Sequence, residues 1–501
     1  MKKKVIFWLG VEFTHFCLSN ILQKHLDADY YSVIDITSKP RNFFEKQNLT
    51  EFKKSWYFFD HVKKSNQNVD YEYLKNFEKK YQINLWNLAI NERIFYRFNE
   101  FYKFTKDEIY SILEQECKLF EQILDEINPD FLFTKDASRH HHHLFTEMCK
   151  KRGTKILMLS RTNLGNKVLL SQKSHQFDLK FNPSMNKNLN YKTFSELRKY
   201  LESFKFSKYL NDYNSPTTKK QKLNAGLKYI FADSQNNQEQ YYYYGRTKIK
   251  VLLNAISTSF KTKIRKNFLD KNSVHAPVLK NSFAYFPLHV DMERPLLIEA
   301  PYYTNQIEII RHIVKSLPTG MQLFVKESPA GHTRAWRTIN DYKKIIDIPN
   351  VTLIHPSVQA NELFEHCSLV FTVAGTSGFE ASFYEKPTIV FSDVAYLNMP
   401  SVFRVTEIEK LPELINTALN TQVSLNDVSN FLEYIKENTI DFDWFGFQKS
   451  FYQKFYFDGT LHDTIISESD LKQFIDLHSE QLTQLAKHHI SKINSFDTIK
   501  N

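Results

Sequence analysis

The strongest constraint on the fold of this chain lies in the segment Val373-Ala-Gly-Thr-Ser-Gly-Phe-Glu-Ala381. An apolar run at 368–373 leads into it, and a second apolar run at 388–391 follows Pro387. The order is therefore strand, turn of small residues, helix and strand. That order predicts one β–α–β unit of a parallel sheet whose faces are covered by helices.

The turn within this unit is a candidate anion site. A helix that begins directly after a turn presents free N–H groups and the positive end of its dipole. Gly375 and Gly378 let the main chain approach a ligand closely, and Thr376 and Ser377 add hydroxyl donors, although such a turn can also serve packing alone. Glu380, in the first helical turn, either caps the dipole or accepts a ribose hydroxyl. We expect the phosphate of a nucleotide here.

Length and composition limit the class of protein. With 501 residues the chain is too long for one ordinary core, so two domains are expected. The sequence holds no run of about 18 uncharged apolar residues, so no membrane-spanning helix is expected. The apolar stretch Val5–Leu9 is too short for a signal peptide and predicts a first strand. The four cysteines are far apart, which predicts a reduced, cytoplasmic setting without structural metal.

Apolar runs and helical periods alternate along two parts of the chain. Strands are expected at 4–9, 31–36, 130–134, 155–159, 295–300, 322–326, 351–354, 369–373 and 388–391. Helices are expected at 305–316, 337–346 and 358–366, and a capping box at Thr105 opens another helix that ends near Ile127. This predicts an α/β fold with two Rossmann-like lobes. The expected domains are 1–180 (first lobe, with a helical insertion), 181–284 (helical linker), 285–405 (second lobe) and 406–501 (helical C-terminal region).

Polar residues at strand ends are further candidates, because open α/β sheets bind ligands at the carboxyl ends of their strands. Asp136 follows a first-lobe strand and is a candidate general base, for which Glu12 and His15 compete. His289 lies at the junction before the second lobe. Lys326 ends a second-lobe strand, where its ammonium could neutralise a diphosphate. For each, an ordinary solvated or structural side chain is the alternative.

The run His140–His143 predicts no metal site, because adjacent histidines on a helix point in different directions. The chain also lacks a Walker A lysine loop, a Gly-x-Ser-x-Gly elbow and a His-Glu-x-x-His motif. A phosphate site without a P-loop lysine favours a nucleotide leaving group over ATP hydrolysis.

The net charge of +10 is concentrated in one segment, Tyr244–Lys271, which has eight basic residues and one acidic residue. Apolar residues recur there at helical spacing, namely Ile249, Leu252, Leu253, Ile256, Phe260, Ile264 and Phe268. Such a basic amphipathic helix can lie on an anionic membrane surface. A solvated basic face on a packed helix is the alternative, and we favour it.

Four segments resemble the bacterial capsule or surface polysaccharide biosynthesis proteins that have a GT-B glycosyltransferase fold. They are 285–289 with Glu293, 300–306, 316–327 and 375–387. A weaker likeness covers Asn84–Trp86, Arg93 and the region from Pro129-Asp130 onward. Together these segments span residues 80–400, and the last of the four is the most specific.

The resemblance implies an acceptor on the first lobe and a nucleotide-sugar donor on the second. In related transferases that use CMP-activated acids, a His-Pro pair contacts the nucleotide phosphate. Here that position reads Ser328-Pro329, which argues against a CMP-type donor, although the Ser328 hydroxyl can still donate one hydrogen bond. Many retaining enzymes of this fold have a glutamate seven residues before the equivalent of Glu380. Val373 occupies that position, which favours an inverting mechanism.

The implied activity is transfer of a sugar to a growing capsule or surface polysaccharide. A first-lobe base would deprotonate the acceptor hydroxyl, and the helix start and Lys326 would stabilise the departing phosphate. Neither cofactor nor metal is expected. The expected partners are a nucleotide sugar, a glycan or lipid-linked glycan acceptor and an anionic membrane surface, with no nucleic acid. The expected location is the cytoplasm, including the inner face of the plasma membrane.

Two other functions stay open. Another GT-B enzyme, such as a sugar-nucleotide 2-epimerase or a polyol-phosphate transferase, would share the lobes and the phosphate site. A non-catalytic protein of a polysaccharide assembly complex would account for the missing histidine before Pro329 and for the basic helix around 248–266.

Overall fold

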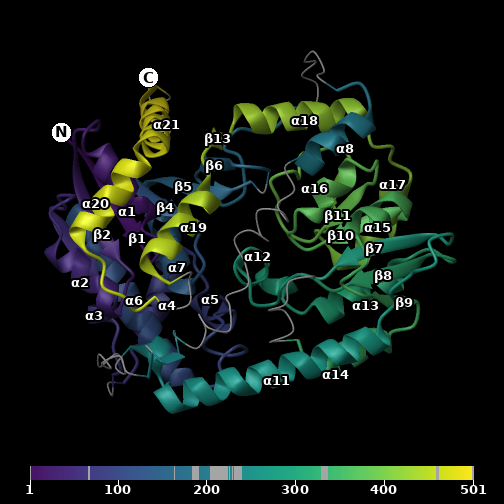
Figure 1. Cartoon of the computed structure of the whole chain (residues 1–501), viewed down its shortest axis with the longest axis horizontal. Coiled ribbons are helices and arrows are strands. Elements are labelled where there is room, and N and C mark those ends of the chain that lie inside the picture. Colours follow the sequence, from purple (N-terminus) through teal and green to yellow (C-terminus); the bar gives the residue numbers. More distant parts are fainter. Residues whose placement is uncertain are drawn as a thin grey trace.

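The computed structural model describes residues 2–498 except 66–67, 163, 183–190, 204–223, 225, 228, 231–239, 329–336 and 458–461. The chain forms two α/β lobes that lie side by side and are bridged along one edge by a long helix (Figure 1). Each lobe has its own sheet with helices on both faces. The predicted α/β class, with two Rossmann-like lobes and a helical C-terminal region, is confirmed.

The first lobe contains a seven-stranded sheet in the order β13-β6-β5-β4-β1-β2-β3. Its strands are β1 (Lys3–Leu9), β2 (Ala28–Ile34), β3 (Lys54–Tyr57), β4 (Phe131–Lys135), β5 (Lys155–Arg161), β6 (Lys167–Ser171) and β13 (Ile440–Asp441). The strands from β3 to β5 run parallel, whereas β6 and β13 add to the edge in antiparallel pairs. The order of the parallel strands therefore reverses between β1 and β4.

Two helical layers cover this sheet because alternate residues of β1 point to opposite faces. Phe7 and Leu9 share one apolar cluster with α1 and the C-terminal helices, while Ile6 and Trp8 share another with helices α3 to α7. The first-lobe helices are α1 (Thr14–Leu22), α2 (Ser38–Lys46), α3 (Phe58–His61), α4 (Tyr71–Tyr81), α5 (Leu85–Ile90), α6 (Lys106–Ile127) and α7 (His140–Lys151). The predicted capping box opens α6, since Thr105 and Glu108 each accept from the other's main-chain N–H.

The second lobe contains a six-stranded, fully parallel sheet in the order β12-β11-β10-β7-β8-β9. Its strands are β7 (Phe283–Pro287), β8 (Gln322–Lys326), β9 (Val351–Ile354), β10 (Leu369–Thr372), β11 (Thr388–Val390) and β12 (Val402–Arg404). Its helices include α12 (Arg294–Leu297), α13 (Gln306–Ser316), α14 (Ile339–Ile346), α15 (Ala360–His366), α16 (Ser377–Ser382) and α17 (Leu411–Leu419), with 3-10 turns at Pro301–Tyr303 (η3) and Ile408–Lys410 (η5). Here the strand order reverses between β7 and β10, as in a doubly wound nucleotide-binding sheet.

The prediction of a strand at 295–300 is wrong. Helix α12 begins there instead, with Pro295 in its first turn, where the missing N–H has no intrahelical partner to lose. The first strand of the second lobe is β7, five residues that end in Pro287 and that lie at the centre of the sheet. The residues near His289 are therefore not a hinge between lobes but the carboxyl end of a central strand.

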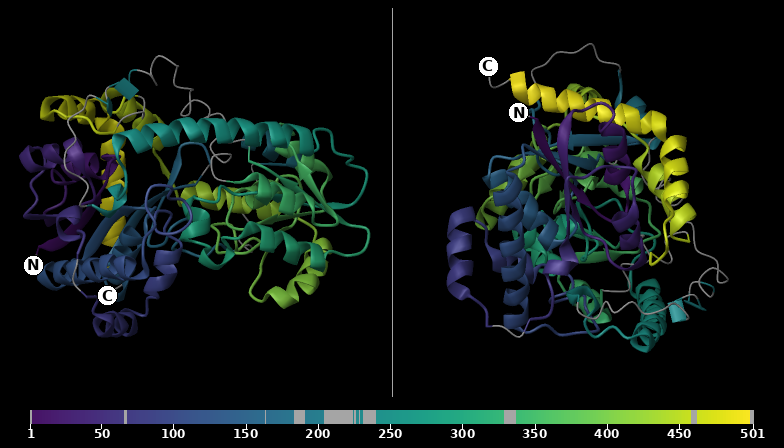
Figure 2. Two further views of the ribbon diagram at one scale, coloured as in Figure 1. Left: turned by 90° about the horizontal axis from the view of Figure 1, so that it is seen from below. Right: turned by 90° about the vertical axis from the view of Figure 1, so that its left-hand side faces the viewer.

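The described elements between the two sheets pack on both lobes. Helix α8 (Phe194–Ser203) packs on the second lobe and the 3-10 turn η2 (Tyr241–Tyr243) on the first, and Figure 2 shows α11 (Lys248–Asn272) running across both lobes. The C-terminal region then divides between the lobes: α18 (Leu425–Glu437) packs on the second, whereas α19 (Trp444–Phe455), α20 (Glu468–Leu477) and α21 (Ser479–Thr498) return to the first. The chain thus crosses between lobes more than once.

Two bulk expectations concern membranes and cysteines. Within the described residues, no helix combines the length and apolar character needed to span a bilayer. All four cysteines are buried free thiols.

Candidate functional site at the facing edges of the two sheets

Each sheet leaves a crevice where its strand order reverses. At such a point the helices that follow the two central strands leave toward opposite faces, so the carboxyl ends of the strands stay uncovered. In the first lobe these ends are Leu9 of β1 and Lys135 of β4; in the second they are Pro287 of β7 and Thr372 of β10. The loops that follow these ends contain most of the predicted site residues.

Ion pairs join the two uncovered edges across the boundary between the lobes. Arg294, shortly after β7, places Nη1 3.5 Å from Oδ2 of Asp136, directly after β4. Arg97 of the first lobe lies 4.0 Å from Asp291 of the second. Because Asp136 and Arg294 both follow central strands, the carboxyl edges of the two sheets face each other.

In the second lobe, His289 ties the ends of β7 and β10 together. Its Nε2 accepts a hydrogen bond from the N–H of Val373 at 3.1 Å and lies 3.0 Å from the Thr372 hydroxyl oxygen. That hydroxyl oxygen in turn accepts from the N–H of Gly375 at 3.1 Å. Burial lowers the pKa of His289 to about 4, so the ring is neutral at pH 7 and its proton is assigned to Nδ1. This arrangement suits a positioning or donor role better than that of a base.

The two glycines of the turn are required by close packing. A Cβ atom at Gly375 would lie 2.7 Å from Cε1 of His289, and one at Gly378 would collide with the Tyr396 hydroxyl. That hydroxyl donates to the carbonyl oxygen of Gly375. The glycines therefore let the turn pack against His289 and Tyr396, a structural reason that exists beside any ligand role.

The remaining turn residues lie half-buried at the start of α16. Among the described residues, none accepts a hydrogen bond from the main-chain N–H of Thr376 or Ser377. The Thr376 hydroxyl donates to Glu380 at 3.0 Å, which holds that carboxylate beside the helix start. Within the described residues Glu380 makes no hydrogen bond that caps the helix, but its carboxylate in the first turn of α16 lies near the positive end of the helix dipole.

A buried polar clamp that the sequence did not reveal fixes the main chain of His289. Gln306, the first residue of α13, accepts from the His289 N–H at 2.7 Å and donates to its carbonyl oxygen at 3.0 Å. Arg337 donates to the same carbonyl at 2.8 Å and to Asp291 at 3.0 Å, and it also pairs with Glu327. Burial alone would lower the pKa of Arg337, but Glu327 and Asp291 outweigh it and raise it. No motif at these widely separated positions signals their convergence.

Lys326, at the end of β8 and beside the end of β7, is buried. Within the described part of the chain its ammonium has no hydrogen bond or ion pair, in contrast to the neighbouring Glu327, which accepts from Arg337 and Tyr342. Burial lowers the pKa of Lys326. Ser328 follows and is half-buried, with its N–H donating to Glu327 at 2.7 Å. A buried lysine without a protein partner is a candidate for an anionic ligand.

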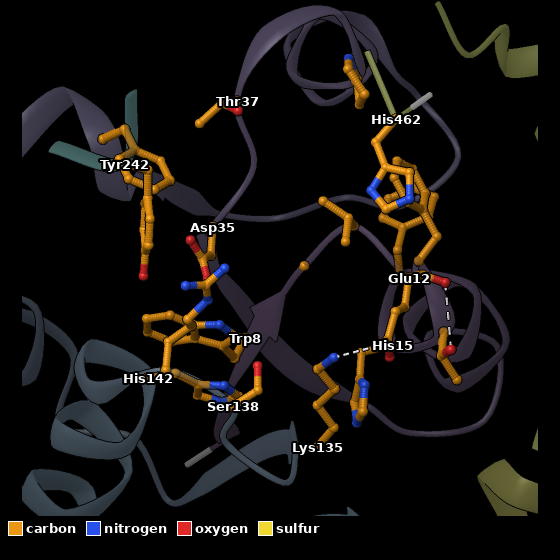
Figure 3. A pocket seen from close by; sticks show the side chains of 18 of the residues that line it. Trp8, Glu12, His15, Asp35, Thr37, Lys135, Ser138, His142, Tyr242 and His462 are labelled. Carbon is orange, nitrogen blue, oxygen red and sulfur yellow. Dashed lines mark hydrogen bonds and ion pairs between the residues drawn. The ribbon is translucent and has the colours of Figure 1, made fainter. Parts of the chain in front are cut away.

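The first-lobe crevice is a cavity of about 470 Å³, which Figure 3 shows in close-up. Glu12 and Lys135, from the ends of β1 and β4, form an ion pair of 2.6 Å on one side of it. Gln448 of α19 donates to the second oxygen of Glu12 at 2.8 Å. Arg139 and Arg246 add positive charge to the lining. The cavity is large enough for a sugar unit and carries both signs of charge.

Of the candidate bases, Asp136 is the one at the boundary between the lobes. Burial alone would raise the pKa of its carboxyl, but Arg294 and His175 outweigh that effect and lower it. Its proton affinity is therefore low while the pair with Arg294 persists. His15 is buried in the wall of the first-lobe cavity, where burial, together with His489 and Lys135, lowers its pKa to about 3. The structure thus brings Glu12 and His15 together in the first lobe and places His289 in the second.

A second cavity, of about 630 Å³, lies between the lobes beside these groups. The first lobe contributes residues from the segment 87–98, and the second contributes, among others, the start of α13 and Arg337. Its lining includes Arg97 and Asp291, the ion pair across the boundary. The clamp on His289 is therefore reached from an interlobe cavity.

The histidine run lies at the start of α7. The rings of His140 and His141 are nearly perpendicular, with an interplanar angle of 89°, as expected for neighbours on a helix. One nitrogen of each nevertheless turns toward Glu116, so that a ligand atom from each of the three lies within 4.8 Å of the others. The two rings thus point in different directions, as predicted, but that alone does not exclude a metal site, because each ring still places one nitrogen near the same carboxylate.

The buried, neutral His15 predicts a loss of stability in acid. The unfolded chain takes up a proton near pH 6.5, whereas folded His15 does so only near pH 3, so stability falls as the pH drops below 6.5. Replacing His15 by methionine removes this contribution. Between pH 7.5 and 5, we expect the free energy of unfolding of His15→Met to fall by about 2 kcal/mol less than that of the wild type. Urea unfolding at both pH values measures this, and equal falls would contradict it. The exposed His25→Met serves as the control.

Comparisons with known proteins bear on this site. Residues 166–404 match the family model described as capsule polysaccharide biosynthesis protein. A search of curated proteins finds no match.

Among solved structures, the chain is similar to the UDP-GlcNAc 2-epimerase of Methanocaldococcus jannaschii, with 14% identity, coverage of 87% of this chain and 99% of that one, and a TM-score of 0.24. It is similar to the KpsC β-Kdo 2,7 transferase of Thermosulfurimonas dismutans, with 10% identity, coverage of 62% and 79%, and a TM-score of 0.28. It is also similar to the HepE protein of Anabaena, solved with UDP-glucose, with 13% identity, coverage of 90% and 98%, and a TM-score of 0.24. These TM-scores are low, so the fold assignment depends on the two sheets themselves.

The family match extends from the end of the first-lobe sheet through every strand of the second lobe, and it contains the turn at Gly375. The resemblance seen in the sequence is therefore confirmed for residues 166–404, which match the model of the capsule polysaccharide biosynthesis proteins.

Proposed function

We propose that this chain transfers a sugar from a nucleotide-sugar donor on the second lobe to a glycan acceptor on the first. The observation that carries the proposal is that the carboxyl edges of two doubly wound sheets face each other, joined by Arg294 and Asp136. Ligands of such sheets bind at these edges. A donor and an acceptor held on opposite edges would therefore meet between the lobes, where bound water can be excluded.

The donor diphosphate would lie against the turn before α16. The N–H groups of Thr376 and Ser377 have no acceptor among the described residues, and Lys326 supplies a buried positive charge nearby in the sheet. The neutral His289 can donate from Nδ1, because its Nε2 is already used by Val373. These donors would stabilise the negative charge that develops on the departing nucleoside diphosphate, and their task requires no divalent metal.

The acceptor would occupy the first-lobe cavity and present a hydroxyl to the boundary. We propose an inverting displacement: the hydroxyl oxygen attacks the anomeric carbon, its proton passes to a carboxylate, and the bond from that carbon to the diphosphate breaks. Asp136 is our first choice for the carboxylate because it lies at the boundary, and separation from Arg294 would raise its proton affinity. Glu12, paired with Lys135 inside the cavity, is the second choice.

The buried lysine gives the donor site a sharp test. Lys326→Met removes a buried charge without a described partner, so the free protein should unfold at the same temperature or higher. Its affinity for the donor nucleotide should fall about 10- to 100-fold, the usual effect of losing one hydrogen bond from a charged group. Calorimetry with UDP-, GDP- and CMP-sugars measures the affinity. Lys315→Met, which removes an exposed lysine of the same lobe, serves as the matched control.

Two outcomes would count against the proposal. Unchanged nucleotide affinity in Lys326→Met would remove the donor site from this position. Formation of an epimerised free sugar from a nucleotide sugar, with no acceptor present, would replace transfer by epimerisation. Product analysis of the same panel of nucleotide sugars detects the second outcome.

We further propose that α11 holds the protein on an anionic membrane surface. Ile249, Leu253, Ile256, Phe260 and Ile264 follow one face of this helix at helical spacing, and each is between 57 and 71% exposed. An exposed apolar stripe of this length is unusual for a protein surface. The structure therefore favours the membrane alternative over the solvated basic face that the sequence alone suggested.

Charge supports an anionic bilayer as the occupant of this stripe. Lysines flank it, of which Lys261 pairs with Glu100 at 3.1 Å and Lys266 with Asp270 at 2.6 Å. An apolar face bordered by lysines lies in the plane of a bilayer with its ammonium groups among the lipid phosphates. Because α11 bridges the lobes on the outside of the molecule, this orientation would hold both lobes near the surface (Figure 2).

Vesicle flotation tests this orientation. The wild type should float with vesicles that contain phosphatidylglycerol and far less with pure phosphatidylcholine. In the double variant Ile256→Asp, Phe260→Asp, the partition coefficient should fall at least tenfold, or about 1.4 kcal/mol, because two inserted side chains become charged. Leu477→Asp, at an exposed leucine of α20, should float like the wild type. Equal flotation of the double variant would contradict the proposal.

A further inference from the structure

A cluster of four buried side chains lies behind the wall of the first-lobe cavity and has no part in the proposed transfer. It consists of Glu116 of α6, His140 and His141 of α7, and Tyr241 of η2, and it is called the inner cluster here. All four are at most 3% exposed. They come from three segments, and Tyr241 is 100 residues or more distant from the others in sequence. These side chains are therefore brought together by tertiary packing and not by closeness in the sequence.

The donor atoms of the inner cluster converge at the spacing of metal ligands. His140 Nε2 lies 3.0 and 3.1 Å from the two oxygens of Glu116. The Tyr241 hydroxyl lies 3.1 Å from Glu116 Oε1 and 3.2 Å from His141 Nδ1. In a tetrahedron whose vertices are about 3.1–3.3 Å apart, the centre lies about 2 Å from each vertex. That distance is the length of Zn–N and Zn–O bonds. A ligand atom from each of Glu116, His140 and His141 lies within 4.8 Å of the other two.

Both histidines are oriented from behind by a carboxylate. His140 Nδ1 lies 3.0 Å from Glu92, and His141 Nε2 lies 3.0 Å from Asp35. A hydrogen bond to the outer nitrogen fixes the tautomer that leaves the inner nitrogen with a lone pair, and metal-bound histidines nearly always have such a partner. In this cluster the outer partners belong to the loops after α5 and β2, so the whole arrangement is braced from two sides.

We propose that the inner cluster binds one four-coordinate divalent cation, zinc by its mixture of two imidazoles and two oxygen ligands. His140 Nε2, His141 Nδ1, a Glu116 oxygen and the Tyr241 hydroxyl oxygen are the ligands, and Glu92 and Asp35 support the two histidines. Imidazole and carboxylate together suit zinc better than magnesium or calcium, which prefer oxygen alone. With four protein ligands the site is closed, so the cation has a structural role and not a catalytic one.

The metal-free protein has to hold the same groups in a different protonation state. His140 lies between two carboxylates, with Nδ1 3.0 Å from Glu92 and Nε2 3.0 Å from Glu116, so without a cation its ring can donate from both nitrogens as a buried imidazolium. Binding of the cation replaces the proton that His140 shares with Glu116 and releases it to solvent. The cation and the proton therefore compete for one position.

A cation bound in the inner cluster would hold in place the segment that connects the first lobe to α11. Tyr241 lies a few residues before that helix, and its neighbour Tyr242, like Asp35, lines the first-lobe cavity. Arg139, which also lines the cavity, pairs with Glu92 at 3.4 Å. A cation that links α6, α7 and η2 would thus hold one wall of the acceptor cavity and the base of α11.

Metal analysis of the whole chain tests the proposal. The protein is produced with added zinc, purified without a polyhistidine tag or nickel resin, dialysed, and measured by inductively coupled plasma mass spectrometry. We expect about one zinc ion per chain in the wild type and less than one-tenth as much in Glu116→Gln, whose amide keeps the size but not the charge. His143→Gln changes a histidine of the same helix that lies outside the inner cluster. This variant should retain as much zinc as the wild type. Cobalt added to metal-free wild type should give visible absorption bands of a four-coordinate site.

Stability gives a second readout that does not depend on the folding of a variant. A strong chelator should lower the melting temperature of the wild type by several degrees, and added zinc should restore it. Tyr241→Phe, which removes one ligand oxygen and is otherwise apolar, should lose zinc at a lower chelator concentration than the wild type. The proposal is overturned if the wild type holds no stoichiometric metal and ignores the chelator, which leaves the buried imidazolium as the resident state. It is equally overturned if Glu116→Gln retains as much zinc as the wild type, since the ion would then bind adventitiously elsewhere.

Discussion

The reversal of strand order between β1 and β4, and again between β7 and β10, decides where the candidate residues of this chain lie. At each reversal the carboxyl ends of two neighbouring strands stay uncovered, because the following helices leave to opposite faces. Glu12 and Lys135 meet at the first of these points, and His289 packs against Gly375 at the second. The ion pair between Arg294 and Asp136 then joins the two edges. The topology of the two sheets therefore provides one binding edge for each of two substrates, whatever side chains line those edges.

The charged groups behind these edges are mostly buried and paired. Such networks add little net stability, but removing one partner typically costs about 3–5 kcal/mol, so they fix one geometry. Arg337 illustrates this, since it is held by Glu327 and Asp291 and in turn holds the main chain of His289. Lys326 differs, because no described residue pairs with its ammonium. A buried charge kept without a protein partner favours an anionic ligand over a packing role.

The sequence allowed the fold class and most strands of both sheets to be predicted, because buried parallel strands are continuous apolar runs. It failed at β7, whose five residues end in Pro287 and resemble a junction, and at Pro295, where a short helix looked like a strand. It also missed β3, β6, β12 and β13, strands at or next to the sheet edges that are two to five residues long. The turn at Gly375 could be found because its glycines and hydroxyl residues are local. The clamp on His289 and the inner cluster could not, since Gln306 and Tyr241 reach their partners only through tertiary packing.

The most direct test of the two-edge account is a crystal structure with a bound nucleoside diphosphate. If the donor binds at the facing sheet edges, the diphosphate lies within hydrogen-bonding distance of the N–H groups of Thr376 and Ser377 and of the Lys326 ammonium, with its terminal phosphate toward Asp136. A nucleotide seated in the first-lobe cavity, or on a surface away from both sheet edges, would contradict the account.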